Sequence, residues 1–170
     1  IGQQMLPSLE VIETSPAQSK KHIDGLKGLI GHVQHYMALE SSREELYEVK
    51  DMNIYTLCES IFQQAKKSFQ PEVSGVLQVP RVNIRTNAKA LEEILLYLLN
   101  NAAMHTESGK ISLEFKKRSA HTGQFIVTDT GIGIPEEKRA NLFKPFAGVQ
   151  DLTEGDGLGL PTCSLIAYKL

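Results

Sequence analysis

The chain has 170 residues, of which 41% are hydrophobic and 22% are charged, so it is long enough to form one folded domain with a sizeable core. Its net charge of −2 gives no reason to expect nucleic acid or a membrane surface as the main partner. No apolar run approaches the ~18–20 residues that span a bilayer, and no signal peptide is expected at Ile1. The two cysteines, Cys58 and Cys163, lie far apart in predicted helices, which favours reduced, buried thiols over a metal site.

Residues 17–46 have the spacing of a helix with one narrow apolar seam, whereas residues 1–16 lack a clear pattern. The seam residues recur at steps of three and four: Ile23, Leu26, Ile30, Val33 and Met37. A seam of this kind needs a partner helix, from this chain or from a second copy. Glycines inside it weaken the isolated helix by up to ~1 kcal/mol each. Two interpretations remain: a helix that merely covers the following domain, or one helix of a dimerising hairpin.

From about residue 49 onward, the pattern alternates between helix and strand. The pattern predicts helices at 54–69, 88–105, 136–142 and 158–168, and strands at 73–79, 82–86, 110–117 and 124–128. The last two strands both alternate apolar and polar residues around a turn at 118–123, so they are expected to pair antiparallel. Residues 148–157 are polar and contain glycine, which predicts a loop.

The long helix predicted at 88–105 carries a polar stripe, because Tyr97, Asn101 and His105 are spaced four apart. On its own, such a stripe opposite an apolar face is most often just a solvated surface. The amide oxygen of Asn101 would, however, suit a hard cation such as Mg²⁺ that phosphates already hold.

A second motif, D-T-G-I-G-I-P at residues 129–135, directly follows a predicted strand. The carboxylate of Asp129 could accept a hydrogen bond from an exocyclic amine such as that of adenine. The two glycines would let the backbone approach a flat ring closely. Taken alone, the same pattern is more typical of a plain loop that uses glycine for its turn.

Two further motifs follow, and each is weak evidence by itself. L-F-K-P-F at residues 142–146 could anchor a flexible segment or simply end a helix on the core. G-D-G-L-G-L at residues 155–160 opens the final helix, where free backbone N–H groups favour an anion such as phosphate. It is not a Walker A loop, because no Gly-Lys-Ser/Thr follows, and no strand precedes it as in a Rossmann fingerprint.

In this order and at these intervals, the four motifs resemble the N, G1, F and G2 boxes of the sensor histidine kinase catalytic domain, a GHKL ATPase with the Bergerat fold. The resemblance runs from about residue 54 to residue 170. It implies an α+β fold, an α/β sandwich in which three helices cover a mixed or antiparallel sheet. The heptad helix and residues 37–42 resemble the second helix and exit linker of the family's dimerisation hairpin. The expected domains are therefore a partial hairpin at 1–48 and an ATP-binding domain at 49–170, without the family's final strand pair.

The resemblance also implies ATP and Mg²⁺ as cofactors. It places Asn101 and Tyr97 at catalytic positions, with Asn101 as the Mg²⁺ ligand and Asp129 as the reader of the adenine amine. Phe143 and Phe146 would flank the ATP lid, whose closure positions the γ-phosphate. The implied cofactor-binding residues are Asn101, His105, Asp129, Gly131, Gly133, Ile134, Phe143, Phe146, Gly155, Gly157, Leu158 and Gly159.

The sequence departs from the family's pattern at three points. Tyr97 stands where the N box usually has an asparagine or an acid, and tyrosine is a poor Mg²⁺ ligand. Met104 replaces a basic residue that reaches the phosphates, a loss of about 1.5–3 kcal/mol unless Lys144 or Lys138 compensates. No histidine fits the phosphoacceptor motif; those considered are His22, His32, His35, His105 and His121. ATP binding is therefore the safer expectation than ATP use.

The resemblance implies a protein-histidine kinase, whose phosphoryl group goes to a histidine on an upstream helix outside this sequence. From there the group passes to an aspartate on a response-regulator receiver domain. The resemblance implies a homodimer formed through the N-terminal helices. It also implies a cytoplasmic domain, which can belong to a membrane-anchored sensor. The alternative is a degenerate nucleotide-binding module that signals without phosphotransfer.

A chaperone, gyrase or mismatch-repair type of ATPase ranks last, because those usually have an acid at the position of Tyr97 and lack the heptad helix. The exit linker argues against a serine-kinase relative of the anti-sigma type.

Overall fold

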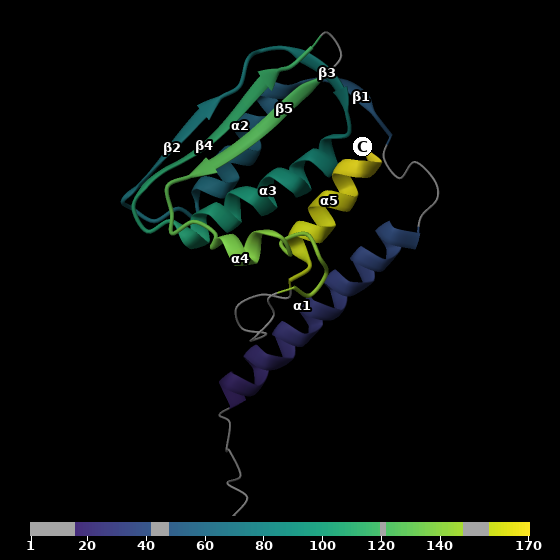
Figure 1. The fold of residues 1–170 in the computed structure, drawn as a ribbon, viewed down its shortest axis with the longest axis vertical. Helices are drawn as coiled ribbons and strands as arrows, with labels where there is room; N and C mark the ends of the chain where they lie inside the picture. The colour runs from purple at the N-terminus through teal and green to yellow at the C-terminus, as the bar shows by residue number, and fades with distance from the viewer. Residues whose placement is uncertain (1–15, 42–47, 120–121, 148–156) are drawn as a thin grey trace, which may run out of the picture.

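The computed structural model describes residues 16–41, 48–119, 122–147 and 157–170 (Figure 1). Its helices are α1 (Pro16–Ser41), α2 (Ile54–Lys66), α3 (Ala88–His105), α4 (Glu136–Arg139) and α5 (Gly159–Lys169). Its strands are β1 (Lys50–Asn53), β2 (Val73–Gln78), β3 (Asn83–Thr86), β4 (Gly109–Lys117) and β5 (Gly123–Asp129). Within these ranges, none of the helices has the length and apolar character needed to cross a membrane.

The strands form two sheets. The larger has the order β2-β4-β5, in which β2 runs parallel to β4 and β5 runs antiparallel to it, so the sheet is mixed. In this register Val73 lies opposite Gly109, and Ile111 lies opposite Asp129. The smaller sheet is the antiparallel pair β1 and β3. The predicted antiparallel pairing of residues 110–117 with 124–128 is confirmed.

The core lies between the larger sheet and helices α2 and α3, which cover the same face of it (Figure 1). Ile111 and Leu113 of β4 are fully buried there, against residues such as Ile61 of α2 and Leu99 of α3. Removing one such side chain from water contributes roughly 1.5–3 kcal/mol. Helix α5 packs beside α3, which completes the sandwich of a mixed sheet and three helices that the sequence predicts.

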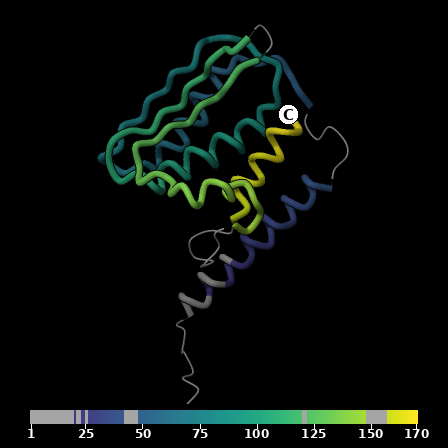
Figure 2. The backbone as a smooth tube through the Cα atoms, viewed as in Figure 1, coloured from purple at the N-terminus to yellow at the C-terminus, as the bar shows by residue number. Residues whose placement is uncertain are grey.

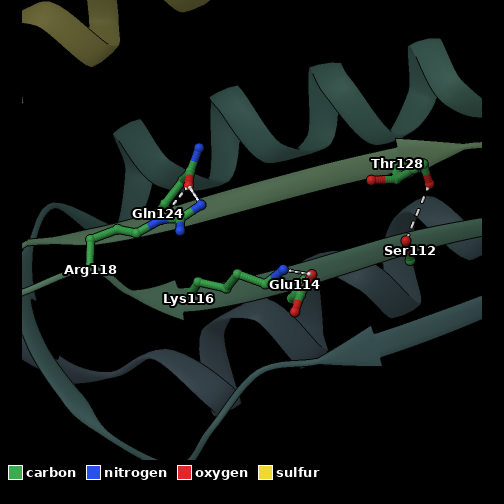
Figure 3. Close-up of polar contacts among 6 residues, drawn as sticks. All are labelled: Ser112, Glu114, Lys116, Arg118, Gln124 and Thr128. Atoms are coloured by element: carbon green, nitrogen blue, oxygen red, sulfur yellow. Dashed lines mark hydrogen bonds and ion pairs between the residues drawn. The ribbon is translucent and has the colours of Figure 1, made fainter.

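The opposite face of the sheet is mostly polar, although Val76 and Ile126 also lie on it. There Lys116 pairs with Glu114 at 3.2 Å, and the Nε of Arg118 donates to the side-chain oxygen of Gln124 at 2.7 Å (Figure 3). Such exposed pairs contribute little stability. This face is therefore a solvated surface, and the chemistry has to be sought at the helix-covered side and its ends.

Two asparagines explain where α2 and α3 begin. The side-chain oxygen of Asn53 accepts the N–H of Thr56 at 3.3 Å, and that of Asn87 accepts the N–H of Ala90 at 3.0 Å. Each bond satisfies a backbone donor that has no partner within the helix. Asn87 also donates to the carbonyl of Glu48 at 2.7 Å, which ties the start of α3 to the segment before β1.

The structure corrects three details of the sequence analysis. Strand β1 was missed, because a four-residue strand with Lys50 and Asp51 exposed has no apolar alternation. The predicted strands 73–79 and 82–86 exist as β2 and β3, but they belong to different sheets. The helix predicted at 136–142 is only the single turn α4. The end of the predicted helix at 42–46 and most of the predicted loop at 148–157 lie outside the described residues.

Helix α1 extends away from the sandwich and meets it only near its own C-terminal end (Figure 2). There Leu39 is buried against Ala90 and Ile166, and His35 contacts Glu93 at 2.8 Å. The seam residues remain largely exposed, with exposed fractions of 51% for Ile23, 51% for Leu26, 55% for Ile30 and 60% for Met37. The helix thus packs on the domain and still presents an apolar seam.

Candidate nucleotide site

Helix α3 supplies the polar stripe predicted at one side of the site. Leu95 and Leu99 face the core, while Tyr97 is 37% exposed and His105 is exposed on the other side. The side chain of Asn101 makes no hydrogen bond with another described residue. Its amide oxygen is therefore available to a ligand.

Asp129 ends β5, and its position opposite Ile111 places it on the helix-covered face of the sheet. One carboxylate oxygen, Oδ1, accepts the backbone N–H of Gly131 at 2.9 Å and so shapes the loop that follows. Within the described part of the chain, Oδ2 accepts no hydrogen bond. Asp129 can thus order its own loop with one oxygen and bind an amine with the other.

The loop after Asp129 lies directly on the C-terminal end of α3. The N–H of Ile132 donates to the carbonyl oxygen of His105 at 3.2 Å. A Cβ added to Gly131 would lie 2.1 Å from that oxygen, so only glycine allows this approach. Gly133 has a different reason to be glycine, since its φ is +71° while the space around it is open.

The same helix also contacts the start of α5. A Cβ added to Gly159 would lie 1.9 Å from two ring carbons of Tyr97, so the ring rests on the glycine backbone. The preceding residue, Leu158, is only 1% exposed, and its carbonyl oxygen accepts the N–H of Thr162 at 2.8 Å. The described end of the last glycine-rich motif, residues 157–160, is thereby fixed to α3 and to the core.

The aromatic motif joins the site through its backbone. The N–H of Phe146 donates to the carbonyl oxygen of Gly157 at 3.2 Å, with positive φ angles of 60° and 65° at these two residues. The rings of Phe143 and Phe146 are more than half exposed. Three contacts therefore link all four predicted motifs: His105 with Ile132, Tyr97 with Gly159, and Phe146 with Gly157.

Other predicted site residues are less tightly held. Ile134 is 41% exposed, and its carbonyl oxygen accepts the Nε of Arg139 at 2.9 Å. Met104, where a basic residue was expected, is 70% exposed. Gly155 lies outside the described residues.

The sequence analysis missed two threonines at the site. Thr130 bridges to β4, because its Oγ1 accepts the N–H of Lys110 at 3.0 Å; its place inside the D-T-G-I-G-I-P motif was the available signal. Thr106 is buried directly after His105, and its Oγ1 has no hydrogen-bond partner among the described residues. Its burial beneath Gly131 depends on the tertiary fold and leaves no local pattern in the sequence.

No group of three or more histidine, cysteine or acidic side chains able to hold a metal ion occurs in the described ranges. Asn101 offers a single neutral oxygen, which fits a hard cation only where phosphate oxygens supply the remaining ligands. The residues present thus fit a cation that arrives with a nucleotide, and no resident metal site forms among the described residues.

A mixed sheet covered by helices, with the described parts of these motifs joined along the C-terminal half of α3, is the arrangement typical of a nucleotide-binding ATPase domain. Residues 86–170, half of the chain, match the family described as "Histidine kinase-, DNA gyrase B-, and HSP90-like ATPase", and the chain belongs to that family.

Curated relatives agree with this assignment, and a solved structure shares the fold. The chain is 26% identical over 166 residues to the adaptive-response sensory kinase SasA of Microcystis aeruginosa, covering 94% of this chain and 43% of that protein. It is 38% identical over 86 residues to the autoinducer 2 sensor kinase/phosphatase LuxQ of Vibrio vulnificus, covering 45% of this chain and 10% of that protein. The full-length ShkA crystal structure superposes with a TM-score of 0.76 at 23% identity, covering 92% of this chain and 35% of that chain. The predicted resemblance to sensor histidine kinases is confirmed, and the chain spans less than half of each of these proteins.

Proposed function

We propose that this chain is the ATP-binding catalytic domain of a sensor histidine kinase. In the whole protein it transfers the γ-phosphate of ATP to a histidine on the dimerisation helix, for relay to an aspartate on a response-regulator receiver domain. The main support for the proposal is the contact of Gly131 and Ile132 with the carbonyl oxygen of His105, at the C-terminal end of α3. It brings the Asp129 loop and the stripe of Asn101 to one end of the fold.

At the base end, Asp129 is proposed to accept the exocyclic amine of adenine. Its Oδ1 already holds the N–H of Gly131, so the carboxylate is oriented before a ligand arrives. Gly131 and Gly133 keep side chains away from the ring, and His105 and Ile134 border it. Pre-oriented acceptors of this kind bind without a further loss of side-chain freedom.

At the phosphate end, Asn101 is proposed to hold Mg²⁺ together with phosphate oxygens of ATP. The bound ion would neutralise part of the phosphate charge. The backbone around Gly157, Leu158 and Gly159 would meet the phosphates, with Gly155, Phe143 and Phe146 bordering the lid. Tyr97, one helical turn before Asn101 on α3, contacts Gly159 of α5. The ShkA structure, which shares this fold, is a complex with AMPPNP, and this supports ATP as the ligand.

The proposal extends to the partners of the whole protein. The exposed seam of α1 supports a homodimer formed through the N-terminal helices, because half-exposed apolar positions at heptad spacing fit a second helix. The sensor kinases among the relatives support a receiver domain as the recipient of the phosphoryl group. We further propose that the domain works in the cytoplasm, with no nucleic acid as a partner.

The second candidate is a nucleotide-binding module that does not transfer phosphate. Tyr97 and Met104 favour it, because neither supplies the Mg²⁺ ligand or the phosphate-binding charge that the family pattern has at these positions. Whole-protein autophosphorylation with labelled ATP separates the two functions. A kinase places label on histidine, whereas the module binds ATP and stays unlabelled.

The test of the nucleotide site is calorimetric titration of ADP and ATP, with and without Mg²⁺, into the chain and its Asp129→Ala variant. We expect binding by the wild type and its loss in the variant. Asp51→Ala on β1 is the matched control, since Asp51 is an exposed aspartate outside the site. Folded wild-type protein that binds neither nucleotide at about 1 mM would contradict the proposal.

A further inference from the structure

Tyr97 covers the first residue of α5. A Cβ built on Gly159 would lie 1.9 Å from Cε2, 1.9 Å from Cζ and 2.1 Å from the hydroxyl oxygen of Tyr97. These distances are far below van der Waals contact, so the hydroxyl edge of the ring occupies the volume that any side chain at position 159 would need. The two residues interlock: the Tyr97 ring of α3 fills the space left because Gly159 of α5 has no side chain.

The interlock gives Gly159 a steric role. Its φ lies outside the left-handed region, unlike that of Gly157 at +65°, so the backbone conformation at 159 does not itself require glycine. Glycine is needed at 159 because of the ring above it. The last glycine of the motif is therefore explained by a contact between helices as well as by access for a phosphate.

Tyr97 also holds α5 close to Asn101. It precedes Asn101 by one helical turn on the same stripe of α3. On the other side, the buried Leu158 anchors the same turn of α5 in the core. Leu158 provides no side-chain cap for the first N–H donors of α5, those of Gly159 and Leu160. The position of these donors relative to Asn101 is set by the contact between Tyr97 and Gly159.

We propose that Tyr97 is a positioning residue that fixes the start of α5 beside Asn101, so that the phosphates of a nucleotide meet both together. This inference rests on the proposed function. It gives Tyr97 the role of positioning α5 in place of Mg²⁺ ligation, for which a tyrosine side chain is poorly suited. It also predicts that Tyr97 matters for the phosphates and not for the base, because Asp129 and its loop contact α3 at the opposite end of the stripe, near His105.

The test compares adenosine, which has no phosphate, with ADP and Mg²⁺ in calorimetric titrations of the wild type, Tyr97→Ala and Tyr97→Phe. We expect Tyr97→Ala to weaken ADP binding about tenfold or more while adenosine affinity stays within about twofold. Tyr97→Phe keeps the ring and should retain ADP affinity within about threefold. Tyr168→Ala is the matched control, since Tyr168 is an α5 tyrosine that is 90% exposed, and it should change neither affinity.

Gly159→Ala tests the same contact from the other helix and does not depend on Tyr97→Ala folding well. It should lower ADP affinity without lowering adenosine affinity. Gly159→Ala should lower thermal stability strongly in the wild-type background, where Tyr97 is present, and much less in the Tyr97→Ala background. An equal loss in both backgrounds would overturn the interlock.

The outcomes separate this inference from the proposed function. Wild-type protein that binds neither adenosine nor ADP overturns the nucleotide site itself, and the positioning role falls with it. Wild-type binding with an unchanged ratio of ADP to adenosine affinity in both Tyr97→Ala and Gly159→Ala overturns only the positioning role.

Discussion

The backbone N–H of Ile132 donates a 3.2 Å hydrogen bond to the carbonyl oxygen of His105. This carbonyl belongs to the last turn of α3, where helices leave their final carbonyl groups without intrahelical donors. The loop after Asp129 therefore completes the end of the helix that carries Asn101. The bond thus satisfies one of these carbonyl groups and holds the Asp129 loop against the helix that carries Asn101.

The two glycines of this loop should respond differently to alanine. In Gly131→Ala the new methyl group would lie 2.1 Å from the His105 oxygen, so the loop must separate from α3 and lose the Ile132 bond. In Gly133→Ala the methyl group meets open space, and only the positive φ of 71° costs energy, about 1–2 kcal/mol. We expect Gly131→Ala to lower the free energy of unfolding more than Gly133→Ala, measured by chemical denaturation. A smaller loss in Gly131→Ala would contradict the seating of this loop.

Thr106 should tolerate the loss of its hydroxyl group. The side chain is 1% exposed, and its Oγ1 has no partner among the described residues, so the hydroxyl is desolvated without compensation. Thr106→Val keeps the shape and removes the polar atom, and we expect stability to rise by about 1 kcal/mol. Thr106→Ser keeps the hydroxyl, removes the methyl group and should be destabilising. If Thr106→Val proves less stable than the wild type, the hydroxyl binds an ordered water.

Much of this fold could be predicted from the sequence because local patterns determine it. The helix over 88–105 and the antiparallel pair at 110–117 and 124–128 have strong periodicity, and the structure contains both. Strand β1 could not be predicted, because its four residues have no apolar alternation. They form a strand only by pairing with β3. The placement of β2 and β3 in separate sheets likewise depends on distant partners.

The four motifs of the site were predictable from their order and spacing, whereas the contacts that join them were not. Nothing local indicates that Tyr97 rests on Gly159, since the two residues are brought together only when α5 packs on α3. The burial of Thr106 has the same origin, because it follows from the seating of Gly131. Sequence patterns thus predicted the candidate residues, and tertiary packing gives several of them a structural role.

Helix α1 should depend on one buried leucine for its contact with the domain. Leu39 is 3% exposed and packs against Ala90 and Ile166. Leu39→Ala leaves a cavity there and should cost about 2–3 kcal/mol of the docking free energy, so that amide hydrogens of α1 exchange faster. Gln34→Ala is the matched control, because Gln34 is an exposed residue of α1 outside the apolar seam, and it should leave this exchange unchanged. Equal exchange in the wild type and Leu39→Ala would contradict the docking of α1 on the domain.

The two cysteines should make stability depend on alkaline pH. Burial raises the pKa of Cys58 to about 11 from its ordinary value of 9.0. Burial, with a smaller contribution from Glu93, raises the pKa of Cys163 to about 12. Both thiols stay protonated in the folded chain while the unfolded chain ionises above its ordinary pKa. Their contribution to stability is therefore complete below pH 9 and declines as pH rises toward 11 and 12.

Two measurements check this dependence. Iodoacetamide should alkylate the native chain slowly and the denatured chain quickly at the same pH, because the reactive species is the thiolate. Denaturation across alkaline pH should show a shallower decline for a Cys58→Ala, Cys163→Ala double variant than for the wild type, since tyrosines and lysines titrate equally in both chains. A decline of the same steepness in the two proteins would mean that the thiols ionise alike in the folded and unfolded states. Burial of Cys58 and Cys163 would then have no effect on their protonation.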